Sequence, residues 1–514
     1  MTQVSNKKVR VRFAPSPTGG LHMGGVRTAL FNYLFAKKHN GDFILRIEDT
    51  DQTRYVKGAE EYIIEALKWC GIEPNEGVGF GNGTHAPYRQ SERKSSGIYW
   101  EYAQKLIASG HAYYAFDTEQ ELEAMRKRLE AAKVAAPQYN HITREHMRNS
   151  LTLSHTEVQK LLDDKVPFVI RLKVPRNEEI RFNDIIRGWI VVNSSTIDDK
   201  VLLKSDGMPT YHLAHVVDDI EMQITHVVRG EEWLPSAPAH VLTYKYLGLE
   251  NNMPNLAHLP LILKPDGKGK LSKRDTSGLP MFPMNWHDER TGEHYIGYKE
   301  SGFFPEAFIN MLALLGWNPG NNQEVLSKQE LIDLFSFEKV HKAGAKFDPE
   351  KTKWFNQQYL RKKDKHQLAA LLQEILIEKN ITADTEYLAN VCELMKEKAY
   401  FVKDIFEMGQ FFFFEPQTYD EKIIQKKWNH DNKKIIETLL EQLNLTTPFN
   451  HETIHQTLDN FSKNTGKIDF QLLRTLSTGV SSGPSLAHIF EILGKEKTLA
   501  RIKKAIQTLT INIS

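Results

Sequence analysis

The segment from Val9 to Lys38 shows the clearest pattern of apolar and polar positions in the chain. Apolar residues alternate with Arg10 and Arg12 as far as Phe13, which predicts a β-strand. After Gly25 the apolar residues recur with the spacing of one helix face. They are Val26, Ala29, Leu30, Tyr33 and Leu34. A strand, a Pro- and Gly-rich turn and an amphipathic helix are typical of the start of a parallel α/β sheet.

The same alternation continues and is then interrupted. A strand is predicted at Phe43–Ile47 and a helix at Lys57–Trp69. From Tyr88 the pattern changes to the helices Ser95–Ser109 and Glu119–Ala136, followed by short strands. Those strands are Phe168–Val174, Trp189–Val192 and Val201–Leu203. We interpret this stretch as a separate module inserted in the sheet domain.

The sheet is expected to resume with strands at Tyr211–Val217 and Ile224–Arg229, and helices follow without interruption from Pro349. Apolar stripes such as Leu368, Leu371, Leu372 and Ile375 and the buried-looking run Phe411–Phe414 mark this helical part. The predicted fold class is α/β, a Rossmann-like doubly wound parallel sheet with an inserted α+β module and an all-helical C-terminal region. The expected parts are 1–87 and 211–264 for the two halves of the sheet domain, 88–210 for the insertion, 265–349 for a lysine-loop region and 350–514 for the helical domain.

Composition narrows the class of protein. The chain has 514 residues, enough for several domains, and its 40% hydrophobic and 25% charged content is ordinary for a globular protein. Lys plus Arg (66) nearly balance Asp plus Glu (65), so a nucleic-acid-binding surface has to be local. Cys70 and Cys392 form no motif, and no apolar leader or membrane span is evident. We therefore expect a soluble cytoplasmic enzyme.

The turn from Pro15 to Gly25 is a candidate phosphate site. Its glycines at 19, 20, 24 and 25 let a backbone approach a ligand closely, and the free N–H groups of the following helix attract phosphate. His22 is placed to donate a hydrogen bond or charge to that phosphate. A histidine in such a position is by itself more often structural.

Three charged side chains are expected to meet in one crevice at the carboxyl ends of the strands. They are Arg12 in the first strand, Glu48 after the second and Arg229 at the end of a later one. Guanidinium groups bind carboxylates bidentately, and a carboxylate receives an ammonium group, so the set suits a zwitterion with extra negative charge. The alternative for residues 48–51 is a solvated turn that caps a helix.

The loop Leu263–Gly278 is rich in glycine and positive charge. Its basic residues are Lys264, Lys268, Lys270, Lys273 and Arg274. Such a loop is what a phosphoryl reaction needs, because charge develops on a triphosphate as pyrophosphate leaves. The alternative is a solvated surface loop.

These motifs together resemble the class I aminoacyl-tRNA synthetases, and the chain is similar to the bacterial-type glutamyl-tRNA synthetases over nearly all of its length. The class signatures stand here as His22-Met23-Gly24-Gly25 and Lys270-Leu271-Ser272-Lys273-Arg274, with Gly25 in place of a second histidine and Arg274 in place of a final serine. The glutamyl branch tolerates both changes. Its fuller markers are APSPTG at 14–19, RIEDTD at 46–51, LLKSDGMPTYHLAHVVDD at 202–219, RGEEW at 229–233, FDPEKTKWFNQQYL at 347–360 and TLSTGVSSGPSL at 475–486.

The resemblance implies roles for individual residues. Arg12, Ser16, Glu48, Tyr211 and Arg229 match the residues that hold glutamate, whereas His215 matches a position that often carries another polar residue. His22, Gly24, Gly25, Glu232, Trp233, Ile262, Lys270 and Lys273 match the ATP site, and His22, Gly24, Lys270 and Lys273 the catalytic signatures. Taken singly, Trp233 could belong to the core and Tyr211 could merely pack on the sheet.

The resemblance also implies a reaction in two steps. The α-carboxylate of glutamate attacks the α-phosphorus of Mg²⁺-bound ATP, and the terminal ribose of tRNA-Glu then attacks the resulting adenylate through its 2′-hydroxyl, with tRNA bound before glutamate is activated. Positioning and charge stabilisation would carry catalysis. A guanidinium left unpaired by an amide would discriminate against glutamine.

The remaining segments receive roles in the same way. The insertion would bind the tRNA acceptor end, residues 265–349 would contact the stem, and the helical domain would bind the anticodon. Relatives often carry a zinc site in the insertion, but here the segment reads Tyr114-Ala115-Phe116-Asp117 without thiolates, so we predict no structural zinc and no other metal site. The segment Met281–Gly302 receives no role. We expect a monomer.

Three alternatives remain at this point. A glutaminyl-tRNA synthetase is expected to lack Arg229 and to end in β-barrels, and a tRNA-modifying glutamyl paralogue lacks the anticodon domain. An inert RNA-binding protein on the same fold is the third, since a fold does not prove activity. Whether tRNA-Gln is also charged is not determined by the sequence.

Overall fold

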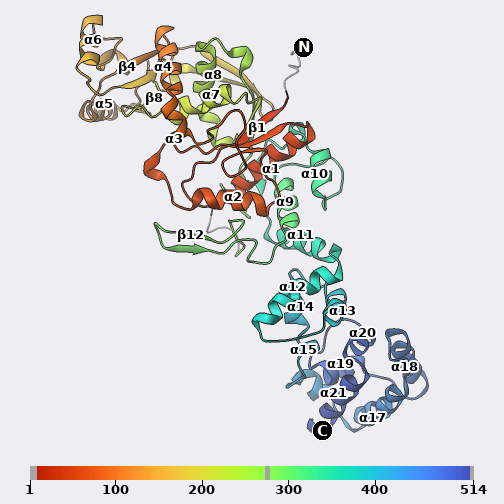
Figure 1. Cartoon of the computed structure of the whole chain (residues 1–514). Coiled ribbons are helices and arrows are strands. Elements are labelled where there is room, and N and C mark those ends of the chain that lie inside the picture. The colour runs from red at the N-terminus through yellow and green to blue at the C-terminus, as the bar shows by residue number, and fades with distance from the viewer. Residues whose placement is uncertain (1–7, 273–277, 510–514) are drawn as a thin grey trace. The chain divides into compact units, whose positions relative to one another are not determined.

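The computed structural model describes residues 8–272 and 278–509, and the chain divides into two compact units between Thr352 and Lys353 (Figure 1). Lys273 and Arg274 of the lysine loop lie outside the described residues.

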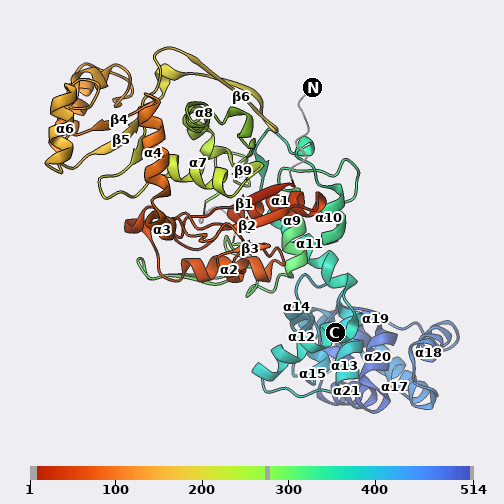
Figure 2. The same ribbon diagram turned by 45° about the horizontal axis from the view of Figure 1, so that its top comes forward.

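A seven-stranded sheet forms the centre of the first unit in the described part of the chain (Figure 2). Its order is β3 (Glu76–Gly77), β2 (Asp42–Leu45), β1 (Arg10–Phe13), β9 (His226–Gly230), β10 (Asn255–Leu259), β6 (Glu179–Asp184) and β7 (Gly188–Asn193). Neighbouring strands run parallel except for β6 and β7. The doubly wound parallel fold is therefore confirmed, and the order reverses between β1 and β9, where ligands of such sheets bind.

Helices cover both faces of this sheet. Helix α1 (Met23–Lys38) packs on β1, β2 and β9, and α9 (Pro305–Leu314) and α10 (Lys328–Leu334) cover its other side, which explains why α1 is buried almost all round. Helices α7 (Tyr211–Glu221) and α8 (Ala237–Tyr246) lie together on the opposite face (Figure 2). Helix α2 (Ala59–Trp69) follows β2.

The strand predicted at Tyr211–Val217 is wrong, because these residues form the start of helix α7. Leu213, Ala214, Val216 and Val217 are all buried, and a short apolar run with valines fits a buried strand as well as a buried helix. Packing decided the outcome: the helix continues to Asp218 and Asp219, whose carboxylates reach buried arginines.

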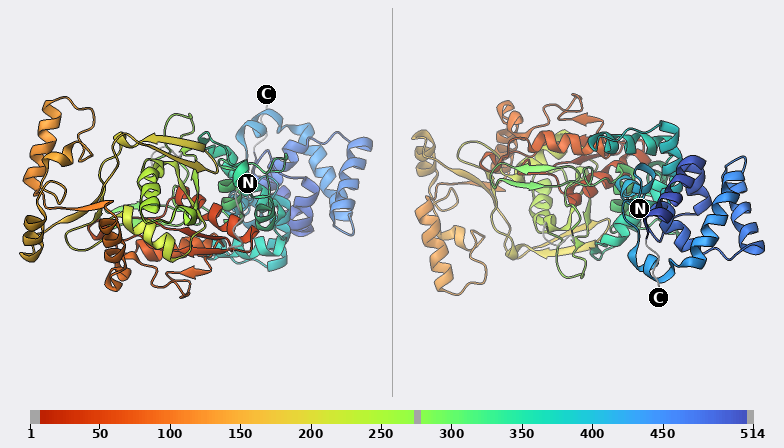
Figure 3. Two further views of the ribbon diagram at one scale, coloured as in Figure 1. Left: turned by 90° about the horizontal axis from the view of Figure 1, so that it is seen from above. Right: turned by 90° about the horizontal axis from the view of Figure 1, so that it is seen from below.

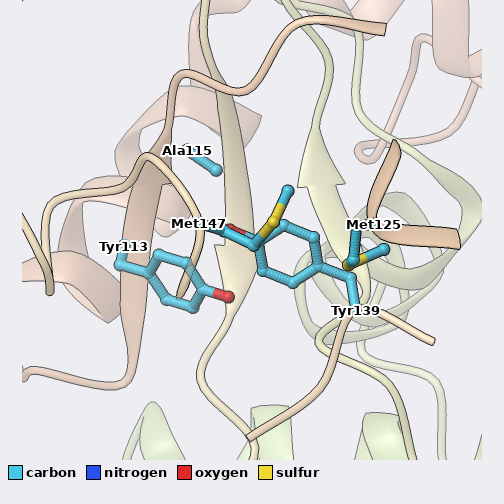
Figure 4. Close-up of a cluster of buried hydrophobic side chains, with 5 residues drawn as sticks. All are labelled: Tyr113, Ala115, Met125, Tyr139 and Met147. Carbon is cyan, nitrogen blue, oxygen red and sulfur yellow. The ribbon is translucent and has the colours of Figure 1, made fainter. Parts of the chain in front are cut away.

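Part of the expected insertion forms its own small sheet. Strands β4 (Ala112–Ala115), β5 (Val169–Leu172) and β8 (Val201–Leu203) pair, accompanied by α3 (Gln90–Arg93), α4 (Ile98–Ala108), α5 (Glu119–Ala131) and α6 (His155–Asp163). Both views of Figure 3 show the segment around α5 and α6 projecting from the rest of its unit. Met125 of α5 packs with Tyr113 and Ala115 of β4 and with Tyr139 and Met147 in a buried cluster within this module (Figure 4).

The β6–β7 hairpin departs from this arrangement. Its sequence lies within the expected insertion, yet β6 runs parallel to β10, with Asp184 opposite Leu256, and extends the central sheet. The hairpin is therefore part of the sheet that carries residues Arg12 and Arg229.

The segment Met281–Gly302 supports the turn between β1 and α1. Its hairpin consists of β12 (Trp286–Asp288) and β13 (Glu293–Tyr295). The amide of Met23 donates to the carbonyl of Met281 at 2.8 Å. A Cβ atom on Gly20 would lie 2.6 Å from Trp286, so Gly20 is needed for packing on this hairpin.

Within the described residues the second unit is helical, as predicted, after α11 (Pro349–Lys362), which spans the division. Its helices are α12 (Lys365–Glu378), α13 (Thr385–Met395), α14 (Val402–Met408), α15 (Gln410–Phe413), α16 (Glu421–Lys427), α17 (His430–Leu445), α18 (His451–Asn464), α19 (Phe470–Thr478), α20 (Leu486–Leu493) and α21 (Lys495–Thr508). Phe411 and Phe412 are buried as expected, but Phe414 is exposed because it follows the end of α15. None of the helices in the described ranges combines the length and apolar character needed to cross a membrane.

Neighbouring residues of β12 provide a test of the hairpin packing. Trp286 is buried, and removal of its ring in Trp286→Ala should lower the free energy of unfolding of the first unit by about 3–5 kcal/mol. His287 is exposed on the other face of the same strand, so His287→Ala should change it by less than about 0.5 kcal/mol. Urea unfolding of the full chain measures both, and equal midpoints for the two variants would contradict the packing.

Candidate active site

The strand register brings basic side chains to the face of the sheet that α7 covers. Arg229 on β9 stands directly opposite His258 on β10. Val11 on β1 stands opposite His226, so Arg12 has the same orientation as Val227 and Arg229 on β9. The crevice predicted at the switch between β1 and β9 therefore contains both arginines.

Asp219 of α7 binds two buried arginines. Its Oδ1 accepts hydrogen bonds from Arg12 Nε at 3.0 Å and from Arg46 Nη1 at 2.8 Å. Burial by itself would raise the pKa of Asp219, but the two guanidinium groups hold it well below its ordinary value. Arg12 thus already has a carboxylate partner within the protein.

Glu48 closes the crevice on the β2 side. Its amide donates to the carbonyl of Pro15 at 3.0 Å, and its Oε1 accepts from Arg46 Nη2 at 2.9 Å. His215 Nδ1 lies 3.8 Å from the same oxygen. Against the effect of burial, His215 and Arg46 lower the pKa of Glu48, which stays ionised at neutral pH. The structure therefore excludes the solvated-turn interpretation for Glu48, which is buried.

His215 and Ser16 differ in their surroundings. Burial lowers the pKa of His215 to about 4 in spite of the nearby Asp219, so the imidazole is neutral at pH 7. Ser16 is exposed in the turn after β1, where its carbonyl accepts from the amide of Thr18 at 2.8 Å.

Arg229 is held by two neutral groups. Its Nη1 donates to Tyr211 Oη at 2.5 Å and its Nε to His258 Nε2 at 3.0 Å. Burial raises the pKa of Tyr211 to about 12, so the phenol keeps its proton. Nη2 of Arg229 is buried and has no hydrogen-bond partner among the residues that the structure describes. Tyr211 therefore contributes to the site as well as to packing.

The three buried arginines of this crevice differ in their partners. Arg12 and Arg46 contact the carboxylates of Asp219 and Glu48 directly. Among the described residues Arg229 contacts no carboxylate directly, because the buried Asp184 reaches it only through His258. A buried charge without a partner is costly, so the arrangement favours a ligand that brings a carboxylate to this position.

The turn predicted to bind phosphate has a different local structure from the one expected. His22 caps α1, because its Nδ1 accepts from the amides of Gly24 at 3.1 Å and Gly25 at 3.3 Å. These amides are therefore already bonded and not free as the sequence suggested. A Cβ atom on Gly24 would lie 3.0 Å from His22 Cε1 and 3.9 Å from Ile262 Cδ1, and a Cβ atom on Gly25 would lie 2.4 Å from Leu21 Cδ1, so the turn is closely packed at both glycines.

Lys270 stands near this turn. Its Nζ donates to Glu232 Oε1 at 2.9 Å, and the bond from Lys270 and the proximity of His22 lower the pKa of Glu232 although burial opposes this. Strand β11 (Ile262–Leu263) fixes the root of the lysine loop, since Leu271 donates its amide to the carbonyl of Ile262 at 2.8 Å. Lys273 lies outside the described residues.

Trp233 lies next to Tyr211. Its ring centroid is 4.7 Å from that of Tyr211, and 43% of the residue is exposed. Trp233 is therefore not part of the core, and its exposed ring is available for stacking.

No group of three or more His, Cys, Asp or Glu residues is placed to hold a metal ion in the part of the chain that the structure describes. The expectation that the insertion lacks structural zinc stays a prediction.

Sequence reasoning missed the partners of the predicted residues. Arg46, Asp219 and His258 are all buried polar residues in the site. A signal was present, because a charged or polar residue inside an apolar strand or helix needs a buried partner. The sequence does not reveal which partner each of them has.

Comparison with known proteins agrees with this geometry. The family model "tRNA synthetases class I (E and Q), catalytic domain" matches residues 8–354, and the model "Anticodon binding domain" matches residues 367–506. The glutamate–tRNA ligase of Cytophaga hutchinsonii is 56% identical over 517 residues, covering 99% of each chain, and that of Amoebophilus asiaticus is 53% identical over 508 residues, covering 98% of this chain and 99% of the relative.

A solved structure is similar over the same length. The glutamate–tRNA ligase of Elizabethkingia meningosepticum, described in complex with its amino acid, is 50% identical, with a TM-score of 0.92 over 98% of this chain and 100% of the other. The glutamate-tRNA synthetase of Elizabethkingia anophelis gives a TM-score of 0.90 at 50% identity, with coverage of 98% and 100%. The chain therefore belongs to the glutamate–tRNA ligases of the class I tRNA synthetase family.

Proposed function

We propose that the crevice between β1 and β9 binds L-glutamate, activates it with Mg²⁺-bound ATP and transfers it to the terminal ribose of tRNA-Glu. The observation that supports this most directly is Nη2 of Arg229, a buried cationic group without a partner among the described residues. A carboxylate of the substrate would complete its hydrogen bonding and give Arg229 a charged partner in direct contact.

Each end of glutamate finds complementary groups. Arg229 and Tyr211 would bind the side-chain carboxylate, and Arg12 would add positive potential while Asp219 keeps its guanidinium in place. Glu48, together with the turn at Ser16, would receive the α-amino group. An amide in place of the side-chain carboxylate would leave the charge of Arg229 uncompensated, so glutamine should be rejected.

The ATP half of the site lies along the start of α1. We assign the phosphates to His22, Gly24 and Gly25, since the N-terminus of α1 attracts anions even though His22 Nδ1 accepts from both glycine amides in this structure. We assign the adenosine to Ile262, Glu232 and Trp233. Lys270 pairs with a single carboxylate in this structure, and a triphosphate carries more negative charge, so ATP would draw Lys270 from Glu232 to the phosphates. Lys273 is assigned the same role from its motif.

The reaction needs no nucleophile from the protein. The α-carboxylate of glutamate attacks the α-phosphorus, pyrophosphate leaves, and the 2′-hydroxyl of the tRNA then attacks the carbonyl of the adenylate. His22 and Lys270 would stabilise the charge that develops on the phosphates. The residues of the crevice hold the substrates in line.

The parts of the chain would share the tRNA. We assign the acceptor end to the inserted module 88–210, the stem to residues 265–349 and the anticodon to the helical domain 350–514. The sheet domain would comprise residues 1–87 and 211–264. The protein would act as a monomer in the cytoplasm.

The decisive experiment is charging of purified tRNA-Glu with radiolabelled glutamate and glutamine. We expect glutamate alone to be transferred. Arg229→Ala should raise the KM for glutamate about 100-fold, because one or two hydrogen bonds between charged groups are lost. Arg181→Ala, an exposed arginine on β6, is the control and should leave the KM unchanged. Charging with glutamine, or an unchanged KM in Arg229→Ala, would contradict the assignment.

The lysine loop offers a second test. Lys270→Ala should lower kcat for adenylate formation about 100-fold at a nearly unchanged KM for glutamate, because charge stabilisation at the phosphates is lost. Lys268→Ala removes an exposed lysine of the same loop and should have little effect. Pyrophosphate exchange into ATP in the presence of tRNA measures both, and equal losses would argue for a general effect of loop charge.

The pH dependence of glutamate binding follows from the buried groups. His215, with a pKa near 4, is neutral above pH 5, Glu48 stays ionised because its pKa is lowered, and Tyr211, whose pKa burial raises to about 12, keeps its proton at neutral pH. The KM for glutamate should therefore vary by less than about twofold from pH 6 to 8 and rise only in acid, where His215 and Glu48 take up protons. Steady-state kinetics at saturating ATP and tRNA tests this, and a transition near pH 6.5 would show that another histidine controls binding.

A further inference from the structure

The contact between Arg229 and His258 fixes the tautomer of His258. The Nε–H of a guanidinium can only donate a hydrogen bond, so His258 Nε2, at 3.0 Å, has to be the acceptor. The proton of the neutral imidazole is therefore on Nδ1.

Asp184 accepts a hydrogen bond from this N–H group. His258 Nδ1 lies 2.6 Å from Asp184 Oδ2, which also accepts from the amide of His258 at 3.1 Å. Asp184 Oδ1 accepts from the amides of Ile186 at 3.0 Å and Arg187 at 2.8 Å. Asp184 and His258 are both 0% exposed. The carboxylate is thus held rigidly by four donors, and it favours one orientation of the ring.

The position of Asp184 depends on the β6–β7 hairpin. Asp184 is the last residue of β6, next to β10, and Arg187 of the following turn donates from Nε to the carbonyl of His258 at 3.2 Å. Arg187 also forms an ion pair with Glu231, two residues beyond Arg229. The hairpin therefore contacts both the side chain and the main chain of His258.

The opposite tautomer would place two N–H groups against each other. A proton on Nε2 of His258 would face the Nε–H of Arg229, and a protonated ring would add a second positive charge. Burial and Arg229 lower the pKa of His258, while Asp184 opposes the shift, so the ring is neutral at pH 7. The bonded geometry of Arg229 is compatible only with the tautomer that Asp184 selects.

We propose that Asp184 and His258 are positioning residues for Arg229, which hold its guanidinium with Nη1 on Tyr211 and Nη2 directed to the substrate carboxylate, and that they thereby set the affinity for glutamate. The proposal rests on the role assigned above to Arg229. It assigns to the β6–β7 hairpin a part in selecting the amino acid.

Two substitutions of His258 distinguish its role in positioning Arg229 from its contribution to packing. In His258→Gln the amide oxygen can take the place of Nε2 and accept from Arg229, whereas the bond to Asp184 is lost. In His258→Asn the amide nitrogen can take the place of Nδ1 and donate to Asp184, whereas the acceptor for Arg229 is lost. Both remove the ring, so thermal unfolding of the full chain controls for loss of packing.

We expect His258→Asn to raise the KM for glutamate at least about tenfold, with the KM for ATP unchanged, and His258→Gln to raise it several times less. Asp184→Asn replaces one of the two acceptor oxygens that hold His258 and its turn with a donor. This variant should therefore also raise the KM for glutamate. Equal KM values for His258→Gln and His258→Asn, or a KM within twofold of the native value in His258→Asn, would overturn the proposal.

Arg229→Ala is measured in the same assay, because it distinguishes a failure of this proposal from a failure of the role proposed for Arg229. A large effect of Arg229→Ala with none from His258→Asn would refute the role of Asp184 and His258 alone. No effect from either variant would refute the assignment of Arg229 as well.

Discussion

The site depends above all on one buried carboxylate that binds two buried arginines. Asp219 binds Arg12 of β1 and Arg46, which follows β2, and all three side chains are almost completely buried. Removing one partner from such a group leaves a buried charge uncompensated, which costs far more than a surface ion pair contributes. Helix α7 is therefore fixed over the carboxyl ends of the strands, and Tyr211 and His215 on the same helix are placed against Arg229 and Glu48.

This constraint also explains where the ligand charge belongs. Arg12 and Arg46 contact carboxylates of the protein directly, whereas Arg229 contacts none among the described residues, so the position for a ligand carboxylate is at Arg229. Specificity then follows from one buried group whose neighbours Tyr211 and His258 are neutral and fixed in direction. A neutral ligand can fill the space, but it cannot give Arg229 a charged partner.

Two hairpins stabilise the catalytic crevice from segments that look peripheral in the sequence. The β6–β7 hairpin extends the central sheet and reaches the partner of Arg229, and the β12–β13 hairpin packs Trp286 under Gly20 in the turn before α1. Each joins the site through backbone or buried contacts. Substitutions in these hairpins can therefore change the site without touching a substrate.

The sequence by itself determined the alternation of strands and helices around the β1 turn and the helical C-terminal unit, because periodicity is a local signal. Charged residues in and after the strands also predicted that Arg12, Glu48 and Arg229 meet in one crevice. It did not determine that residues 211–217 are helical, that His22 caps α1, or that Gly20 is needed for packing. Nor did it give the partners of the buried charges, since Arg12 and Asp219 are 207 residues apart. These features were decided by the tertiary structure, because a buried polar group is satisfied by whatever the fold brings next to it, and local pattern carries no record of that neighbour.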